Sequence, residues 1–144
     1  MKILIDADGC PVVDSTIKVG KENEIPVVIL CDTSHIIERP GAKTITVSKG
    51  SDSVDFSLIR LVEKGDLVVT QDYGLAGMVL AKGGLAIRQD GLIYNDTNID
   101  RLLDERHNAK KLRKGGARVK GPRKRTLDDD IQYISSIKRI LGDA

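Results

Sequence analysis

Short runs of apolar residues alternate along the chain with segments in which apolar residues recur every three or four positions. The short runs are typical of buried strands, and the wider spacing is typical of helices with one apolar face. Strands are predicted at Lys2–Asp6, Pro26–Cys31, Thr44–Val47, Leu67–Thr70 and Leu85–Arg88. A sixth strand is predicted at Leu92–Tyr94, after a turn at Gln89–Gly91.

Helices are predicted between these strands. They run from about Pro11 to Glu22, from a start at Gly50–Ser53 to Gly65, from Leu75 to Leu80, from Asn98 to Arg113 and from Leu127 to Leu141. Thr126 and Asp129 form a candidate cap for the last helix. This alternation predicts an α/β fold with three layers, α/β/α, around a central, mainly parallel sheet, and a C-terminal helix after a basic linker. With 144 residues, one domain spanning 1–144 is expected.

Composition excludes several classes of protein. Hydrophobic residues make up 40% of the chain and charged residues 31%, so the chain can bury a core and stay soluble. No run approaches the ~18 apolar residues of a transmembrane helix, and the acids in the opening residues MKILIDADG are unlike a signal peptide. Two cysteines, Cys10 and Cys31, are too few for a disulfide scaffold. We therefore expect a cytoplasmic protein with no membrane partner, and the sequence leaves its oligomeric state open.

Charge is distributed unevenly along the chain. Residues 106–125, called the basic arm below, contain ten Lys or Arg and no Asp or Glu. The other residues carry 13 basic side chains and all 21 acids, a net charge of −8. An acidic body suggests bound cations, and a basic arm suggests a polyanion such as nucleic acid. The alternatives are a solvated basic surface, or cations that balance the acidic body or pair with Asp128–Asp130.

Five aspartates follow predicted strands. Asp6 and Asp8 follow the first strand, Asp52 and Asp55 open the helix after the third, and Asp72 follows the fourth. In a parallel sheet these places share one edge, where ligands collect, so the five carboxylates are expected to form an acidic cup. Crowded carboxylates repel one another, and a divalent cation removes that penalty. Such an ion can activate water and stabilise the leaving oxygen of a phosphodiester.

Each acid also has a structural interpretation. Asp52, Asp55 and Asp72 would serve equally well as acids at helix N-termini. Asp6 is harder to explain in this way, because it continues a buried apolar strand, where an unpaired carboxylate is costly. Neighbouring polar residues are expected to orient the carboxylates, namely Ser51, Ser53, Thr70 and Gln71.

Four segments carry a resemblance to a known family. They are residues 5–12 (IDADGCPV), 50–55 (GSDSVD), 70–76 (TQDYGLA) and 121–126 (GPRKRT). In this order they resemble the YaiI/YqxD family of bacterial proteins over nearly the whole chain, although Gly9 stands where the family often has alanine. The resemblance implies a relative of the PIN-like nucleases, which combine a parallel sheet with an acidic Mg²⁺ or Mn²⁺ site.

The resemblance also implies roles for particular residues. Asp6 would be the central metal ligand and a catalytic residue, Asp72 a second ligand, and Asp52 or Asp55 the acid from the intervening helix start, with Asp8 as an accessory ligand. Apart from the resemblance, cations that precede the N-terminus of the last helix are expected to grip phosphates with the help of its backbone N–H groups, namely Arg118, Lys120, Arg123, Lys124 and Arg125.

Three functions are compatible with the sequence. The first is a metal-dependent nuclease that hydrolyses phosphodiesters, with RNA favoured over DNA as its nucleic-acid partner and Mg²⁺ or Mn²⁺ as its cofactor. The second is a phosphatase of the haloacid dehalogenase type, with Asp6 as nucleophile, Asp8 as general acid, and Lys49 or Lys82 near the phosphate. The third is a non-catalytic protein that binds a metal ion and nucleic acid.

Overall fold

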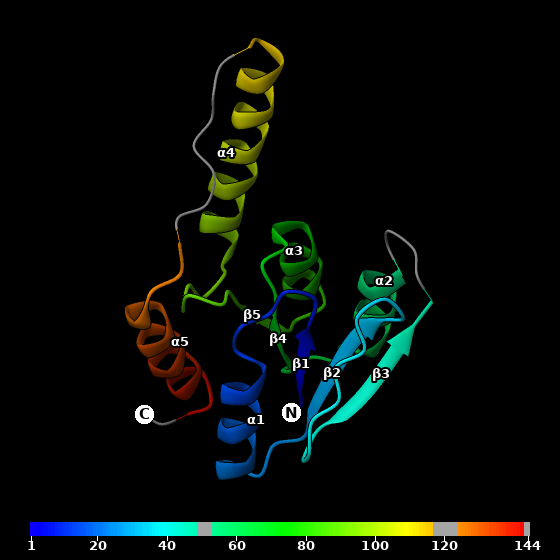
Figure 1. Cartoon of the computed structure of the whole chain (residues 1–144). Coiled ribbons are helices and arrows are strands. Elements are labelled where there is room, and N and C mark those ends of the chain that lie inside the picture. The colour runs from blue at the N-terminus through cyan, green and yellow to red at the C-terminus, as the bar shows by residue number, and fades with distance from the viewer. Residues whose placement is uncertain (49–52, 117–123, 143–144) are drawn as a thin grey trace.

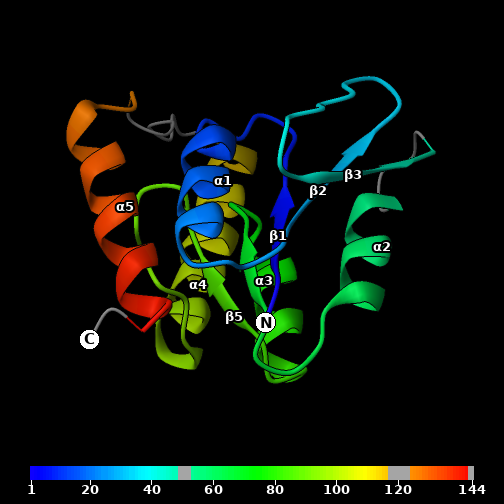
Figure 2. The same ribbon diagram turned by 90° about the horizontal axis from the view of Figure 1, so that it is seen from below.

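A central sheet is covered by helices on both faces (Figures 1 and 2). The computed structural model describes residues 1–48, 53–116 and 124–142. Within these residues the elements are β1 (Ile3–Asp6), α1 (Val13–Glu22), β2 (Val27–Asp32), β3 (Lys43–Val47), α2 (Ser53–Leu61), β4 (Leu67–Val69), α3 (Tyr73–Ala81), β5 (Leu85–Ile87), α4 (Asp96–Lys114) and α5 (Leu127–Ile140). The strand order is β3-β2-β1-β4-β5, and each neighbouring pair is parallel. The predicted α/β class is confirmed.

The central strand β1 shows why these runs form strands. Ile3 and Ile5 belong to the core on one face of the sheet, Leu4 belongs to the core on the other face, and none of the three is exposed. A strand buried on both faces must be apolar at successive positions, because side chains alternate between the faces. In register, Ile5 lies beside Ile29 of β2 and Val69 of β4.

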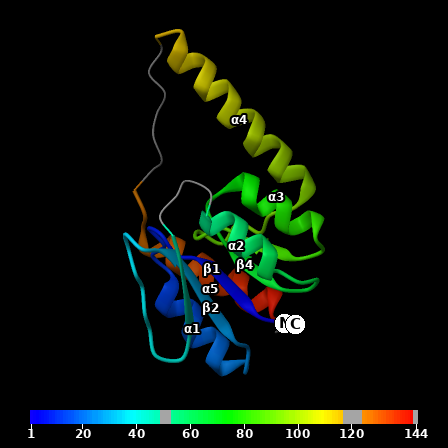
Figure 3. The same ribbon diagram turned by 90° about the vertical axis from the view of Figure 1, so that its right-hand side faces the viewer.

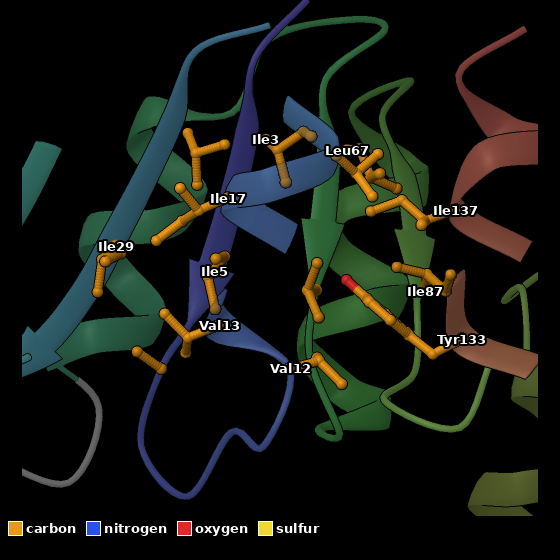
Figure 4. Close-up of a cluster of buried hydrophobic side chains, with 14 of the residues drawn as sticks. Ile3, Ile5, Val12, Val13, Ile17, Ile29, Leu67, Ile87, Tyr133 and Ile137 are labelled. Atoms are coloured by element: carbon orange, nitrogen blue, oxygen red, sulfur yellow. The ribbon is translucent and has the colours of Figure 1, made fainter. Parts of the chain in front are cut away.

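Helices α1 and α5 cover the first face (Figure 4). Val13 and Ile17 of α1 and Ile137 of α5 pack in the same cluster as the apolar strand residues. The hydroxyls of Thr16 and Tyr133, both fully buried, are 2.6 Å apart and tie the two helices together. This contact satisfies both hydroxyls and fixes α5, the last helix, beside the first.

Helices α2, α3 and α4 cover the second face. Their buried residues pack with Leu4 and Val68 and include Leu58, Leu75, Val79, Ile99 and Leu102. Only the first part of α4 takes part in this core, and the rest of the helix extends away from the sheet (Figures 1 and 3). Within the described residues, no helix has both the length and the apolar character needed to cross a bilayer.

Two local predictions have different outcomes. The capping box of α5 is confirmed: the Thr126 backbone N–H donates to Asp129 Oδ2 at 2.8 Å, and the Asp129 N–H donates to Thr126 Oγ1. The strand at Leu92–Tyr94 is wrong, because this segment makes an isolated antiparallel bridge between Ile87 and Ile93. Tyr94 instead turns inward and donates its hydroxyl to the carbonyl of Thr70 at 3.0 Å.

Gly91 allows α5 to approach the loop after β5. Its φ is +95°, and a Cβ at this position would lie 2.6 Å from the carbonyl oxygen of Gln132 in α5. We expect Gly91→Ala to lower the free energy of unfolding by about 2–4 kcal/mol, because backbone strain and overpacking add. Gly65→Ala is the matched control, since Gly65 has φ +87° and a methyl group there would meet no atom within 4 Å beyond its chain neighbours. Urea denaturation measures both, and equal losses would contradict the close packing of α5.

Candidate active site at the carboxyl edge of the sheet

Thr70 joins the two aspartates that follow the adjacent strands β1 and β4. Its hydroxyl is fully buried, donates to Asp6 Oδ2 at 2.9 Å, and accepts the backbone N–H of Asp72 at 3.0 Å. The parallel pairing of β1 and β4 brings the ends of both strands to the same edge. Asp6 and Asp72 are therefore held in one hydrogen-bonded unit, as their positions after predicted strands suggested.

Asp72 is also the N-cap of α3. Its Oδ1 accepts the backbone N–H groups of Gly74 at 2.9 Å and Leu75 at 3.2 Å. The structural interpretation of Asp72 is therefore correct for this oxygen. Both cap bonds end on Oδ1, so the cap does not use Oδ2, and a helix cap and a ligand role are compatible in one side chain.

Asp6 lies in an unfavourable electrostatic environment. Partial burial raises the pKa of its carboxyl group, the hydrogen bond from Thr70 opposes this rise, and the negative charges of Asp72 and Asp8 add to it. The net effect is a pKa above the ordinary value of 3.8. A half-buried carboxylate that faces two other acids destabilises the fold, and this is the kind of arrangement found at functional sites.

The other predicted acids are not part of the hydrogen-bonded unit of Asp6 and Asp72 in the described structure. Asp8 is exposed in the loop after β1, and its charge reaches Asp6. Asp55 is half-buried in the first turn of α2. Asp52 and Ser51 lie outside the described residues, and Ser53 begins α2. In the described part of the chain, no group of three His, Cys, Asp or Glu side chains is close enough to hold a metal ion.

Asp6 and Asp72, called the acid pair below, have a donor chemistry that suits Mg²⁺ or Mn²⁺. Both cations prefer oxygen ligands, and Mg²⁺ is commonly bound by one or two carboxylates with water completing its shell. Asp6 uses Oδ2 and Asp72 uses Oδ1 for hydrogen bonds to the protein. The remaining oxygens, Asp6 Oδ1 and Asp72 Oδ2, are the ones that would contact a cation.

A cleft of about 530 Å³ lies at this edge of the sheet, and its lining includes Gln71 and Tyr73, the two chain neighbours of Asp72. It is lined by residues from the loops after β1, β4 and β5, from the start of α3 and from the segment that leads into α5, among them Gly9, Gln71, Tyr73, Arg88, Gln89 and Arg125. The sequence pattern pointed to Gln71 and Arg125 but not to Tyr73, Arg88 and Gln89. Arg88 and Gln89 directly follow β5, so the rule that selected Asp72 after β4 would also have found them.

Among the described residues of the basic arm, Arg125 reaches this edge. It lines the cleft, and its positive charge counteracts the burial that raises the pKa of the Cys10 thiol to about 11. Its guanidinium also donates to Asp130 at 2.6 Å, so the predicted pairing with the acids of α5 is seen here. Lys124 is exposed, and Arg118, Lys120 and Arg123 lie outside the described residues.

Comparison with known proteins identifies the family. Residues 4–143 match the model described as "Uncharacterized BCR, YaiI/YqxD family". The chain belongs to the YaiI/YqxD family. It is 50% identical over 143 residues to a UPF0178 protein of Exiguobacterium sibiricum, covering 99% of this chain and 98% of that one. A UPF0178 protein of Clostridium acetobutylicum is 49% identical over 143 residues, covering 98% and 97%.

One solved structure is similar in outline. The crystal structure of Rae1 (YacP) from Bacillus subtilis, a W164L mutant, aligns with a TM-score of 0.47 and 16% identity. The alignment covers 81% of this chain and 84% of that one.

The geometry of this YaiI/YqxD protein also bears on the phosphatase alternative. Lys82 follows the last turn of α3, and Asp72 caps the first turn. The nine helical residues between them separate their backbones by about 15 Å. Lys82 donates to the carbonyl of Ile59 instead, so it is not placed to hold a phosphate over Asp6. Lys49 lies outside the described residues.

Proposed function

We propose that this YaiI/YqxD protein is a metal-dependent nuclease that hydrolyses phosphodiesters, with RNA favoured over DNA. The observation that carries the proposal is the Asp6–Thr70–Asp72 unit. It holds two carboxylates together on one sheet edge, and the negative charges of Asp72 and Asp8 both raise the pKa of Asp6. This arrangement weakens the fold, so a functional explanation is favoured over a structural one.

The protein's own groups have defined tasks in this proposal. Thr70 holds Asp6 by one carboxylate oxygen, and the backbone of α3 holds Asp72 by one, so both acids have fixed orientations. A bound Mg²⁺ or Mn²⁺ would supply an activated water and charge stabilisation at the leaving oxygen. Asp8, after β1, adds negative charge beside Asp6.

Basic residues favour a polyanionic substrate. The basic arm has ten Lys or Arg, and Arg125 reaches the cleft beside the acid pair. Contacts from lysine and arginine to phosphates supply most of the sequence-independent affinity for nucleic acid. They would bring a strand to a site that by itself repels phosphate. The preference for RNA rests on the resemblance to PIN-like nucleases.

A calorimetric Mn²⁺ titration tests the proposal. Wild type is compared with the double variant Asp6→Asn/Asp72→Asn, and single-stranded RNA of mixed sequence is then added to each. We expect Mn²⁺ binding and RNA cleavage by the wild type, and neither by the double variant. Both substitutions should preserve folding, because asparagine keeps an acceptor for Thr70 and is itself a good N-cap.

Asp32→Asn is the matched control. Asp32 also ends a strand at this edge, and its carboxylate accepts the backbone N–H groups of Ser34 and His35. This variant should bind Mn²⁺ and cleave RNA like the wild type. Mn²⁺ binding without cleavage by the wild type would favour the non-catalytic alternative. Absence of Mn²⁺ binding would leave only the structural roles of the aspartates, as caps of helices and loops, and would overturn the proposal.

A further inference from the structure

Some residues that line the cleft are direct neighbours, in the chain, of the acids that follow β1 and β4. Gln71, which lines the cleft, stands between Thr70 and Asp72 of the acid unit. Gly9 lines it directly after Asp8. The cleft is therefore lined by residues directly next to Asp72 and Asp8 in the chain, where the nucleotide beside a phosphate held by the acids would lie. The cleft's volume of about 530 Å³ falls in the ordinary range for small organic ligands.

Two glutamine side chains give the cleft a polar edge. Gln71 Nε2 donates to Gln89 Oε1 at 2.6 Å, and Gln89 is 6% exposed. Among the described residues, no buried side-chain nitrogen or oxygen lacks a partner. In the described part of the chain, the side-chain bond of Gln89 uses Oε1, so Nε2 is not buried without a partner, and we assign it to the cleft that Gln89 lines. The locked amide pair thus presents one donor and one acceptor side by side, which matches the edge of a nucleobase.

The arginines of the cleft are already paired with carboxylates. Arg88 donates to both oxygens of Asp90, at 2.8 and 2.7 Å, and these hydrogen bonds lower the pKa of Asp90, so the pair stays charged. Arg125 is paired with Asp130. Paired guanidinium groups attract a free phosphate less strongly, but they remain flat surfaces on which a base can stack.

Tyr73 adds a ring of fixed orientation. It contacts Tyr94 edge-on, with ring centroids 6.3 Å apart and planes at 61°. Tyr94 is itself held by its hydrogen bond to the carbonyl of Thr70. Unpaired RNA bases are recognised by this combination of aromatic rings, arginine planes and amide edges.

We infer that the cleft binds one unpaired nucleobase of the strand that the acid pair cleaves. This inference rests on the proposed function, because that function identifies the ligand as part of an RNA strand. In this role Gln71 and Gln89 contact the edge of the base, and Tyr73 and Arg88 contact its faces. The protein then selects single-stranded over duplex RNA, because a paired base cannot enter the cleft.

Nuclear magnetic resonance titration in EDTA tests this inference on the full-length protein. The probes are AMP, CMP, GMP and UMP, with ribose 5-phosphate as the base-free control. At least one nucleotide should shift the side-chain amide signals of Gln71 and Gln89, and ribose 5-phosphate should not. Gln71→Leu should weaken that nucleotide's binding by about tenfold or more, because a hydrogen-bonded edge is lost. Gln132→Leu, at an exposed position on α5, should bind it normally.

Each arm has an outcome that overturns the inference. Equal shifts with ribose 5-phosphate would make the cleft a phosphate site, and no shift with any nucleotide would exclude a base. A single-stranded tetranucleotide should bind about tenfold more tightly than the mononucleotide with the same base, because its added phosphates contact basic residues. Equal affinities for the tetranucleotide and the mononucleotide would mean that the ligand of the cleft is a free nucleotide and not part of an RNA strand. Because EDTA removes metal ions, these results are independent of Mn²⁺ binding and cleavage, so failure of the proposed function is recognised separately.

Discussion

Asp6→Asn is expected to reduce metal-dependent RNA cleavage by at least about 100-fold while the protein stays folded. Residues that merely orient a metal ligand change affinity or activity by about 10–100-fold, so loss of a ligand should cost more. In EDTA the variant should melt at or above the wild-type temperature. Asparagine can still accept the hydrogen bond from Thr70, but it removes the repulsion from Asp72 and Asp8.

The pH dependence of this effect follows from the raised pKa of Asp6. The protonated carboxyl stabilises the fold below the ordinary pKa of 3.8, and this contribution is lost as the pH rises through the raised folded-state value. Asparagine is neutral at every pH. The gain in the free energy of unfolding should therefore be present at pH 7, at about 0.5–2 kcal/mol, and should shrink as the pH falls.

Asp6→Ala separates charge from hydrogen bonding. It also removes the repulsion, but it leaves the buried hydroxyl of Thr70 without its acceptor. Thermal melts in EDTA should place this variant below Asp6→Asn. An Asp6→Asn protein that is less stable than wild type and still cleaves RNA would show that Asp6 is structural.

Asp66→Asn is expected to lower the free energy of unfolding by about 2–4 kcal/mol. Asp66 is 4% exposed and accepts three hydrogen bonds: Lys2 Nζ at 2.6 Å and the Glu63 N–H at 2.9 Å on Oδ2, and the Lys2 N–H at 3.0 Å on Oδ1. An amide can offer only one oxygen to these three donors. Urea denaturation at pH 7 measures the loss.

The pH dependence is the opposite of that expected for Asp6. Burial by itself would raise the pKa of Asp66, but the hydrogen bonds from Lys2 and Glu63 outweigh it, and the pKa is lowered. The stabilisation is therefore present above pH 3.8 and is lost as the pH falls through the lowered folded-state value. The difference between wild type and Asp66→Asn should disappear in strong acid.

Asp14→Asn is the control for Asp66→Asn. Asp14 pairs with Arg39 at 3.0 Å, but its side chain is 80% exposed, so its replacement should cause no measurable change in stability. Comparable losses in the two variants would mean that the burial of Asp66 contributes nothing.

The sequence predicts the sheet well, because its strands are buried on both faces. Runs such as Pro26–Cys31 have no polar position that could face solvent, and β2 occupies almost the same residues. The prediction of a strand at Leu92–Tyr94 is wrong, because the contacts that set the conformation of this segment are long-range and leave no trace in the local sequence pattern. Tyr94 is buried by a long-range hydrogen bond to Thr70, and Gly91 is packed against α5.

The site is predicted in part. Parallel topology was sufficient to bring Asp6 and Asp72 together, since Asp6 ends β1 and Asp72 comes three residues after the end of the adjacent strand β4. Their connection through Thr70 could not be predicted without the register of β1 and β4. The cleft could not be predicted without the position of α5. A helix that follows a long basic segment cannot be placed from periodicity, so the part of the cleft that Arg125 and Asp129 line could not be predicted, although Arg88 and Gln89 directly follow β5.

The hydrogen bonds that orient the two aspartates also bear on which ion the site would prefer. One oxygen of Asp6 is bound by Thr70, and one oxygen of Asp72 is bound by the backbone of α3. Each side chain therefore presents a single oxygen instead of a chelating pair. Ca²⁺ commonly takes six to eight ligands and chelating carboxylates, whereas Mg²⁺ accepts single carboxylate oxygens and keeps its waters. If the proposed metal site forms, the same bonds that hold the acids in place would therefore favour a small, strongly hydrated cation over calcium.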